Sequence, residues 1–301
     1  MFSRRHPVLF FVLMFSAISS AAMVAVFALV IGGSAVFHAS FSSALEKEHQ
    51  GNVGVVEITG LVASSKSVVK TIKKFRKDPA IKAIVLRINS PGGGVGPAQE
   101  IYREVVKTGQ EKNIVASLGA VAASGGYYAA SAADKIMANP GTITGSIGVI
   151  MEYANFQKIL EKIGLSPVVI KSGEFKDMGS PARELTDQER EILQGVADEI
   201  HMQFVKDVAL GRDLAVDKVK TLADGRIYTG EKAFELDLVD RLGNLGDAVQ
   251  WAGRLGGVEG EIVPVYPKED RIQSITRLFE SLFKAPYITG AISDYFGFVI
   301  N

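Results

Sequence analysis

The chain has 301 residues, enough to bury a sizeable core in one large domain or in two small ones. Its 33 lysines and arginines balance 33 aspartates and glutamates, so the charge gives no indication of a nucleic-acid partner. The absence of cysteine excludes disulfides, thiolate metal sites and cysteine nucleophiles.

The N-terminal segment has the pattern of a membrane anchor. Arg4 and Arg5 precede an uncharged apolar stretch at residues 8–33, and a membrane-spanning helix needs about 20 such residues. We therefore expect residues 1–34 to form a cytoplasmic tip and one transmembrane helix, because basic residues favour the cytoplasmic side. Residues 35–52 follow as a polar tether. A cleaved signal peptide is the alternative, since small residues near Ala35 and Ala39 suit a cleavage site.

Apolar runs then alternate with amphipathic segments, which predicts an α/β domain over residues 53–265 with right-handed crossovers. The run at residues 84–86 is typical of strands covered on both faces of a mostly parallel sheet. The amphipathic tail at residues 266–301 suits a neighbouring subunit or a membrane surface. We expect strands at 53–58, 81–88, 113–118, 135–138, 166–170 and 261–265, and helices at 67–77, 97–107, 153–163, 186–210, 216–222, 231–236 and 245–255.

A single serine stands at the most informative junction of the sequence. The strand predicted at 113–118 stops at Gly119, small residues surround Ser124, and residues 127–131 have helical character. A serine between a strand end and a helix start has an exposed hydroxyl beside backbone N–H groups, which is where a nucleophile is placed. A tight packing turn is the equally weighted alternative from this stretch alone.

Three successive glycines, residues 92–94, precede the helix predicted at 97–107. Glycines in this position allow backbone N–H groups to converge on one point, as in an anion-binding nest. A phosphate-binding loop would end in Gly-Lys-Ser/Thr, and no such lysine follows, which argues against nucleotide binding.

The chain offers few bases for a serine nucleophile. Three of its four histidines lie at positions 6, 38 and 49, in or beside the predicted anchor and tether, and His201 lies within a helix. A lysine can replace histidine when its surroundings lower its pKa. Lys176 lies in a loop rich in small residues, between a predicted buried strand and the capped helix that begins at Thr186. A surface lysine paired with Glu174 or Asp177 is the alternative reading.

Four motifs in order resemble the bacterial signal peptide peptidase A family: residues 89–94 (NSPGGG), 123–128 (ASGGYY), 141–148 (GTITGSIG) and 171–177 (KSGEFKD). The resemblance covers about residues 53–265 and is closest to the short, membrane-anchored form. It implies a ClpP/crotonase-like α/β fold of repeated strand-strand-helix units and a serine protease with a Ser-Lys dyad. Ser124 would be the nucleophile and Lys176 the general base. Ser146 would orient the lysine, with the N–H groups of Gly93 and Gly125 as the oxyanion hole.

The resemblance also implies the partners. The substrates would be remnant signal peptides and other hydrophobic segments, and the enzyme would be a homo-oligomeric ring in which the dyad forms within or between subunits. The chain would lie in the inner, cytoplasmic membrane with its catalytic domain on the extracytoplasmic side. We expect no metal and no cofactor. The alternatives are a stomatin-associated Ser-Lys protease, an acyl-CoA hydratase or isomerase, and a scaffold of this fold without catalysis.

Overall fold

The computed structural model describes residues 51–267. The predicted anchor, most of the tether and most of the amphipathic tail lie outside the described residues. Across residues 51–267, no helix is both long enough and apolar enough to cross a bilayer.

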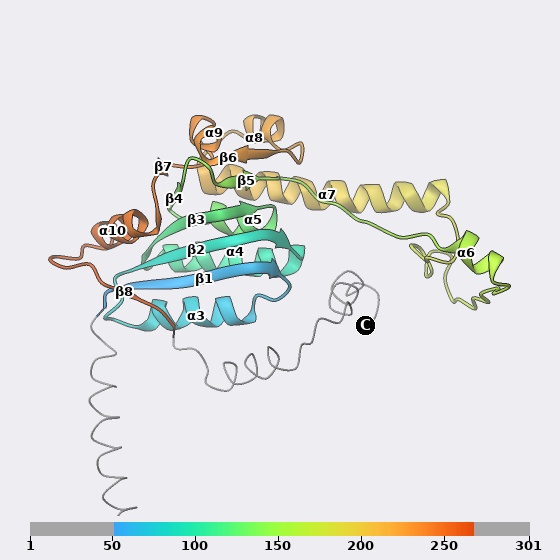
Figure 1. The fold of residues 1–301 in the computed structure, drawn as a ribbon, viewed down its shortest axis with the longest axis horizontal. Helices are drawn as coiled ribbons and strands as arrows, with labels where there is room; N and C mark the ends of the chain where they lie inside the picture. Colours follow the sequence, from blue (N-terminus) through green and yellow to red (C-terminus); the bar gives the residue numbers. More distant parts are fainter. Residues whose placement is uncertain (1–50, 268–301) are drawn as a thin grey trace, which may run out of the picture. The chain divides into compact units, whose positions relative to one another are not determined.

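One mixed sheet forms the centre of the fold (Figure 1). Its main path runs β6-β5-β3-β2-β1-β8, and β4 lies beside the first half of β3, between β3 and β7. All neighbours are parallel except β5 and β6, which are antiparallel. The strands are β1 Val53–Val62, β2 Ala83–Gly93, β3 Asn113–Ala123, β4 Lys135–Ala138, β5 Ile143–Gly145, β6 Ile227–Thr229, β7 Arg241–Leu242 and β8 Pro264–Val265.

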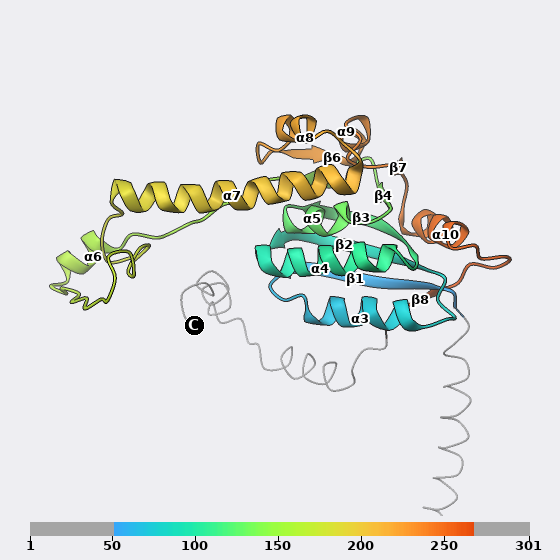
Figure 2. The same ribbon diagram turned by 180° about the vertical axis from the view of Figure 1, so that it is seen from behind.

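Helices cover both faces of this sheet. α4 and α5 pack against β2 and β3, α3 lies against β1 and α4, and α10 packs across β1, β2 and β3 on the opposite face (Figures 1 and 2). The C-terminal part of α7 packs against α5 and α8. The helices are α3 Lys66–Lys77, α4 Val95–Gly109, α5 Gly125–Ser131, α6 Gln157–Lys162, α7 Asp187–Arg212, α8 Val216–Leu222, α9 Gly230–Glu235 and α10 Leu245–Leu255.

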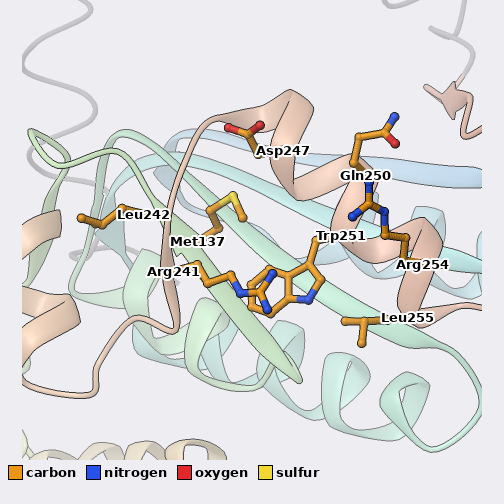
Figure 3. Close-up of a pocket in the computed structure, with 8 residues that line it drawn as sticks. All are labelled: Met137, Arg241, Leu242, Asp247, Gln250, Trp251, Arg254 and Leu255. Carbon is orange, nitrogen blue, oxygen red and sulfur yellow. The ribbon is translucent and has the colours of Figure 1, made fainter.

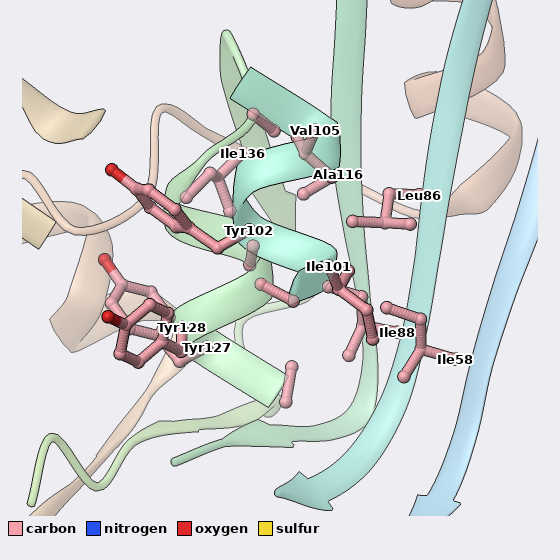
Figure 4. Packing of buried hydrophobic residues seen from close by; sticks show 14 of the residues in the cluster. Ile58, Leu86, Ile88, Ile101, Tyr102, Val105, Ala116, Tyr127, Tyr128 and Ile136 are labelled. Carbon is pink, nitrogen blue, oxygen red and sulfur yellow. The ribbon is translucent and has the colours of Figure 1, made fainter. Parts of the chain in front are cut away.

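The continuous apolar run of β2 is explained by burial on both faces. Successive strand side chains point to opposite sides, so Leu86 and Ile88 pack with Ile101 under α4, as Figure 4 shows. Val85 points the other way and joins Val115 in the smaller cluster under α10. The sequence prediction of a mostly parallel, doubly covered sheet is therefore confirmed.

Three strands run further than predicted: β1 continues to Val62, and the other two extensions lead to the site. β2 continues through the glycines to Gly93, and β3 passes Gly119 to reach Ala123. Gly119 does not stop its strand because its lack of a side chain admits the neighbour: a Cβ there would lie 3.0 Å from the Ile88 carbonyl oxygen. Both extensions carry the chain to the edge where Ser124 lies.

The strand predicted at 166–170 is wrong, and the helix predicted at 153–163 is shorter. Residues 166–170 form no strand, and the side chains of Val168 and Ile170 are 88% and 97% exposed. Only α6, residues Gln157–Lys162, is helical in the other segment. An apolar run predicts a buried strand because it needs a cover, and no part of the described chain covers this one. We call residues 150–170 the apolar arm.

The capped helices follow the prediction closely. Thr186 and Glu189 form a reciprocal capping box at the start of α7, and α10 spans the predicted residues. The short strands β5, β6 and β7 were not predicted, because two or three residues carry no detectable periodicity.

Candidate active site

Ser124 forms the junction between β3 and α5. Its φ of 51° and ψ of −123° lie outside the conformations that serine prefers. Two backbone hydrogen bonds hold the turn: Ser124 N–H donates to the Gly145 carbonyl at 2.9 Å, and Tyr128 N–H donates to the Ser124 carbonyl at 2.8 Å. A strained, sharp strand-to-helix turn of this kind exposes the side chain of its central residue.

The glycine-rich end of β2 runs directly against this turn. Gly92 has a φ of 110°, and a Cβ added to it would lie 2.8 Å from both the Gly125 nitrogen and the Ser124 Cβ. The Gly93 nitrogen in turn lies 3.3 Å from the position of a Cβ on Gly125. Gly125 is the first residue of α5, so its N–H has no acceptor within the helix. The backbones of Gly93 and Gly125 therefore flank Ser124 at close range.

A small hollow opens beside Ser124, and its other lining is mostly apolar. Ile200 and Phe204 of α7 form one wall, and their spacing of four residues places them on the same face of the helix. Neither residue was predicted to lie at the site, although their spacing of four was visible in the sequence. The remaining side chains of the lining are Val95, Ala98, Tyr128 and Val149.

Tyr128 joins this wall to α5, the helix that follows Ser124. Its ring stacks on Phe204 with the ring centroids 4.3 Å apart. Its hydroxyl donates a hydrogen bond to the Asp207 carboxylate, and burial together with that bond raises the pKa of Tyr128. The C-terminal half of α7 is thus fixed against α5.

Ser146 lies close to the same turn. It follows β5, and its neighbour Gly145 accepts the hydrogen bond from Ser124 N–H. Ser146 itself has a φ of 50° and donates its N–H to the Arg226 carbonyl at 2.8 Å. The fold therefore brings four of the predicted site residues to one edge of the sheet: Ser124, Ser146, Gly93 and Gly125.

Lys176 lies elsewhere within one chain. The segment between α6 and α7 carries it, at the end of α7 remote from α5 (Figures 1 and 2). Glu189, to which this segment is tied, precedes Phe204 by 15 residues in α7 (204 − 189), or about 22 Å at 1.5 Å per residue. A single chain in this conformation does not bring the Lys176 amine to the Ser124 hydroxyl.

The Lys176 side chain is exposed and has no ion-pair partner among the described residues. Asp177, the neighbour that the sequence offered as a partner, is instead bound by Lys171 at 2.6 Å and by Arg183 at 2.9 Å. His201 does not line the hollow at Ser124, and the other histidines lie outside the described residues. The structure thus offers no support for a Ser-His pair among residues 51–267.

A larger cavity, of about 600 Å³, lies beside α10 and β7 (Figure 3). The Arg241 guanidinium lies 4.2 Å from the centre of the Trp251 ring, and Arg254 completes a basic rim. None of the predicted site residues lines this cavity. Size alone therefore does not identify the active site in this molecule.

The chain is similar to two families of peptidases and to several known proteases. A model of peptidase family S49 matches residues 107–259, and a Clp protease model matches residues 55–143. A putative protease of Synechocystis sp. is 48% identical over 225 residues, which cover 74% of this chain and 81% of the relative.

Two further relatives are longer than the matched region. A putative signal peptide peptidase SppA of Enterococcus faecium is 42% identical over 179 residues, which cover 59% of this chain and 52% of the relative. Protease 4 of Haemophilus influenzae is 33% identical over 214 residues, which cover 67% of this chain and 34% of the relative.

Proposed function

This chain belongs to peptidase family S49 and is a serine peptidase of the signal peptide peptidase A type, and from that premise we propose that it cleaves remnant signal peptides with a Ser-Lys dyad. Ser124 is the nucleophile, Lys176 the general base and Ser146 the residue that orients the lysine amine. The observation that carries the proposal is the strained backbone of Ser124, which lines one hollow together with Gly93 and Gly125.

The proposed reaction is acyl transfer in two steps. The neutral Lys176 amine takes the proton from the Ser124 hydroxyl as its oxygen attacks the scissile carbonyl, and the ammonium then gives that proton to the leaving amine. The N–H groups of Gly93 and Gly125 stabilise the oxyanion, each contributing about 3 kcal/mol in the transition state. Water, activated by the same lysine, hydrolyses the acyl-enzyme and restores Ser124.

We further propose that each dyad is shared between neighbouring subunits of a ring. The separation of about 22 Å along α7 supports this arrangement, because no rotamer of Lys176 spans it. The apolar arm supports it as well: its large side chains are exposed on a single chain and suit an interface with a second copy.

The proposed substrates are extended hydrophobic peptides, which fit the apolar walls of the hollow at Ser124. The similarity to the putative signal peptide peptidase of Enterococcus faecium favours signal peptides over the substrates of a stomatin-associated protease. The apolar stretch at residues 8–33 would anchor the chain in the inner membrane, with the peptidase domain on its extracytoplasmic side.

Two single variants and their mixture test the proposal. We expect Ser124→Ala and Lys176→Ala to abolish cleavage of a leader peptide while the melting temperature stays unchanged. Co-expression of the two variants should restore about one quarter of wild-type turnover, because a random ring pairs an intact serine with an intact lysine at one interface in four.

Each outcome bears on one part of the proposal. Normal turnover by either single variant would exclude the dyad. Two inactive variants whose co-assembled mixture is also inactive would exclude sharing between subunits and leave the dyad standing. The particle mass of the mixture, measured beside its activity, confirms that mixed assemblies have formed.

A further inference from the structure

Arg183 joins the segment that carries Lys176 to the start of α7. Its Nε donates to Asp177 Oδ2 at 2.9 Å, and its Nη2 donates to the Asp177 main-chain carbonyl at 3.2 Å. The same guanidinium donates through Nη1 and Nη2 to the two carboxylate oxygens of Glu189, at 2.8 and 2.5 Å. One planar fork thus binds both the side chain and the backbone of the residue next to Lys176.

Glu189 gives this clamp a fixed base. It is buried, and its Oε2 also accepts the Thr186 N–H at 2.9 Å in the capping box. The hydrogen bonds from Arg183 and from the Thr186 backbone lower the pKa of Glu189 to about 2, so it is ionised throughout the neutral range. Because α7 packs on α5 through Phe204, the clamp connects the Lys176 segment through α7 to the body of its own subunit.

Arg183 also neutralises a charge beside the base. Lys171 holds Asp177 Oδ1 and Arg183 holds Asp177 Oδ2, so both carboxylate oxygens face cations other than Lys176. These two partners hold the pKa of Asp177 well below its usual range, so the carboxylate keeps its charge. An uncompensated carboxylate next to a lysine favours the ammonium form, which cannot act as a base.

We propose that Arg183 is a positioning residue for the general base: it fixes the Lys176 segment on α7 and directs the Asp177 carboxylate away from the Lys176 amine. The proposal rests on the proposed function of Lys176, and it adds a residue that touches neither the substrate nor the reacting atoms.

Few charged groups surround residues 171–180, which carry Lys176 and which we call the base segment. Within the segment they are Lys171, Glu174 and Asp177; Arg183 and Glu184 precede α7, and Asp187, Glu189 and Arg190 lie in its first turn. Glu152 adjoins Tyr153, the residue that packs against Gly179 of the segment. At the sheet edge that carries Ser124, which the Lys176 of a neighbouring subunit would approach, Asp224 and Arg226 lie beside Ser146 and pair with each other. Among these groups, Arg183 is the cation that bonds to both the base segment and α7.

The test is a pH profile of leader-peptide cleavage by full-length protein carrying Arg183→Ala. We expect kcat to fall between about 10-fold and 100-fold, because a base displaced by an ångström loses that much. The pH at which kcat rises on the acid side should move up by up to about one unit, since only Lys171 still compensates Asp177. KM should stay near the wild-type value, because the hollow at Ser124 is untouched.

Two further variants separate position from charge. Asp177→Asn removes the charge and weakens the clamp, since only the Arg183 bond to the main-chain carbonyl is unaffected, so kcat should fall with no upward shift of the acid limb. Arg183→Lys keeps one positive charge but cannot bind Asp177 and Glu189 at once, so it should restore the acid limb and only part of kcat. These two variants also carry the test if Arg183→Ala fails to assemble.

Arg190→Ala is the matched control. Arg190 is exposed on the first turn of the same helix and forms no ion pair among the described residues, so its loss should leave kcat and the pH profile unchanged. If Arg183→Ala has the kcat and the acid limb of the wild type while Lys176→Ala is inactive, the positioning role of Arg183 is overturned and the proposed dyad is not. Normal turnover by Lys176→Ala would instead overturn the proposed function.

Discussion

A serine at positive φ is uncommon, and the described chain has two at this site, Ser124 with a φ of 51° and Ser146 with a φ of 50°. Each such residue costs about 1–3 kcal/mol, which the surrounding structure must offset. Backbone hydrogen bonds to Gly145 and Arg226 hold the two turns in place. The strain therefore gives the Ser124 hydroxyl a fixed position before any substrate arrives.

Adding one methyl group should show how closely the two backbones at the site are fitted. In Gly92→Ala the new Cβ would lie 2.8 Å from the Gly125 nitrogen, and alanine tolerates a φ of 110° poorly. We expect turnover to fall by at least about 100-fold, as when an oxyanion donor is lost, and stability to fall by about 1–3 kcal/mol. Cleavage rates and denaturant unfolding measure the two effects.

Gly96→Ala is the control for that substitution. Gly96 lies in α4, has no neighbour within 4 Å of an added Cβ and lies outside the hollow at Ser124. Helical alanine is favoured over glycine by roughly 0.5–1 kcal/mol, so this variant should be as active as the wild type and no less stable. Equal activity of both alanine variants would show that the Gly92–Gly125 approach has no catalytic role.

Among the elements, α7 has the widest role. Its last turns bury Phe204, Val205, Val208 and Ala209 in the core, whereas its first turn holds Glu189 and, through it, the base segment. Between these ends most of its side chains are exposed or half-buried. The stability of the start of α7 therefore rests on polar contacts, which depend on pH.

Acid should loosen the start of α7 before the core unfolds. Hydrogen bonds from Arg183 and from the Thr186 backbone lower the pKa of Glu189 from the free value of 4.5 to about 2. A lowered folded-state pKa stabilises the native state fully above the free value, and this contribution disappears as the pH falls from about 4.5 to about 2. Hydrogen exchange of the amides at residues 183–190, followed across this range, measures the loss.

Glu189→Gln supplies the comparison for that experiment. The amide side chain does not titrate, so the exchange of residues 183–190 in this variant should not change across the same pH window once intrinsic rates are removed. An equal acid response in the wild type and in Glu189→Gln would assign the loosening to other carboxylates.

The elements show which patterns a sequence can convey. Thr186 and Glu189 are three residues apart and interact locally, so the capping box was predictable. The apolar residues 166–170 carried the pattern of a buried strand, but Val168 and Ile170 are exposed in one chain. Local patterns report which side chains need a cover, and they do not say whether the cover comes from the same molecule.

At the scale of the whole molecule, the apolar arm holds ten of the exposed large apolar side chains of the described chain. Its exposed side chains extend from residue 150, before α6, through α6 to residue 170, just before the base segment begins. Exposed apolar side chains in such number favour association. The exposed side chains of the arm are Ile150, Met151, Tyr153, Phe156, Ile159, Ile163, Leu165, Val168, Val169 and Ile170.

A charge on this arm should separate the subunits. Ile170 is 97% exposed in a single chain, so Ile170→Asp should not affect the folding of the subunit, whereas a carboxylate buried without a partner opposes assembly. We expect a smaller particle mass by light scattering, loss of peptidase activity and an unchanged near-UV spectrum. Leu210→Asp, at a position that is 75% exposed on α7, should keep both mass and activity. An unchanged mass for Ile170→Asp would exclude the arm as the interface.

The site as a whole was only partly open to prediction. The small residues around Ser124 and the three glycines were visible in the sequence, because such backbone approaches need small residues. Lys176 and Ser146 were named only through the family resemblance, and their catalytic roles stay predictions. Arg183 gave no signal, because its partners Asp177 and Glu189 are six residues away on either side and meet it only after the chain turns at Ser180 and Pro181.

The continuous helix α7 also limits how this chain can change in length. Each residue inserted into an α-helix advances its end by about 1.5 Å and rotates it by about 100°. An insertion between Glu189 and Phe204 would therefore swing the Lys176 segment around the helix axis while Phe204 stayed against Tyr128. The surface loops of such a subunit can lengthen freely, whereas in the proposed ring the span of α7 would set the distance and the direction between neighbouring copies.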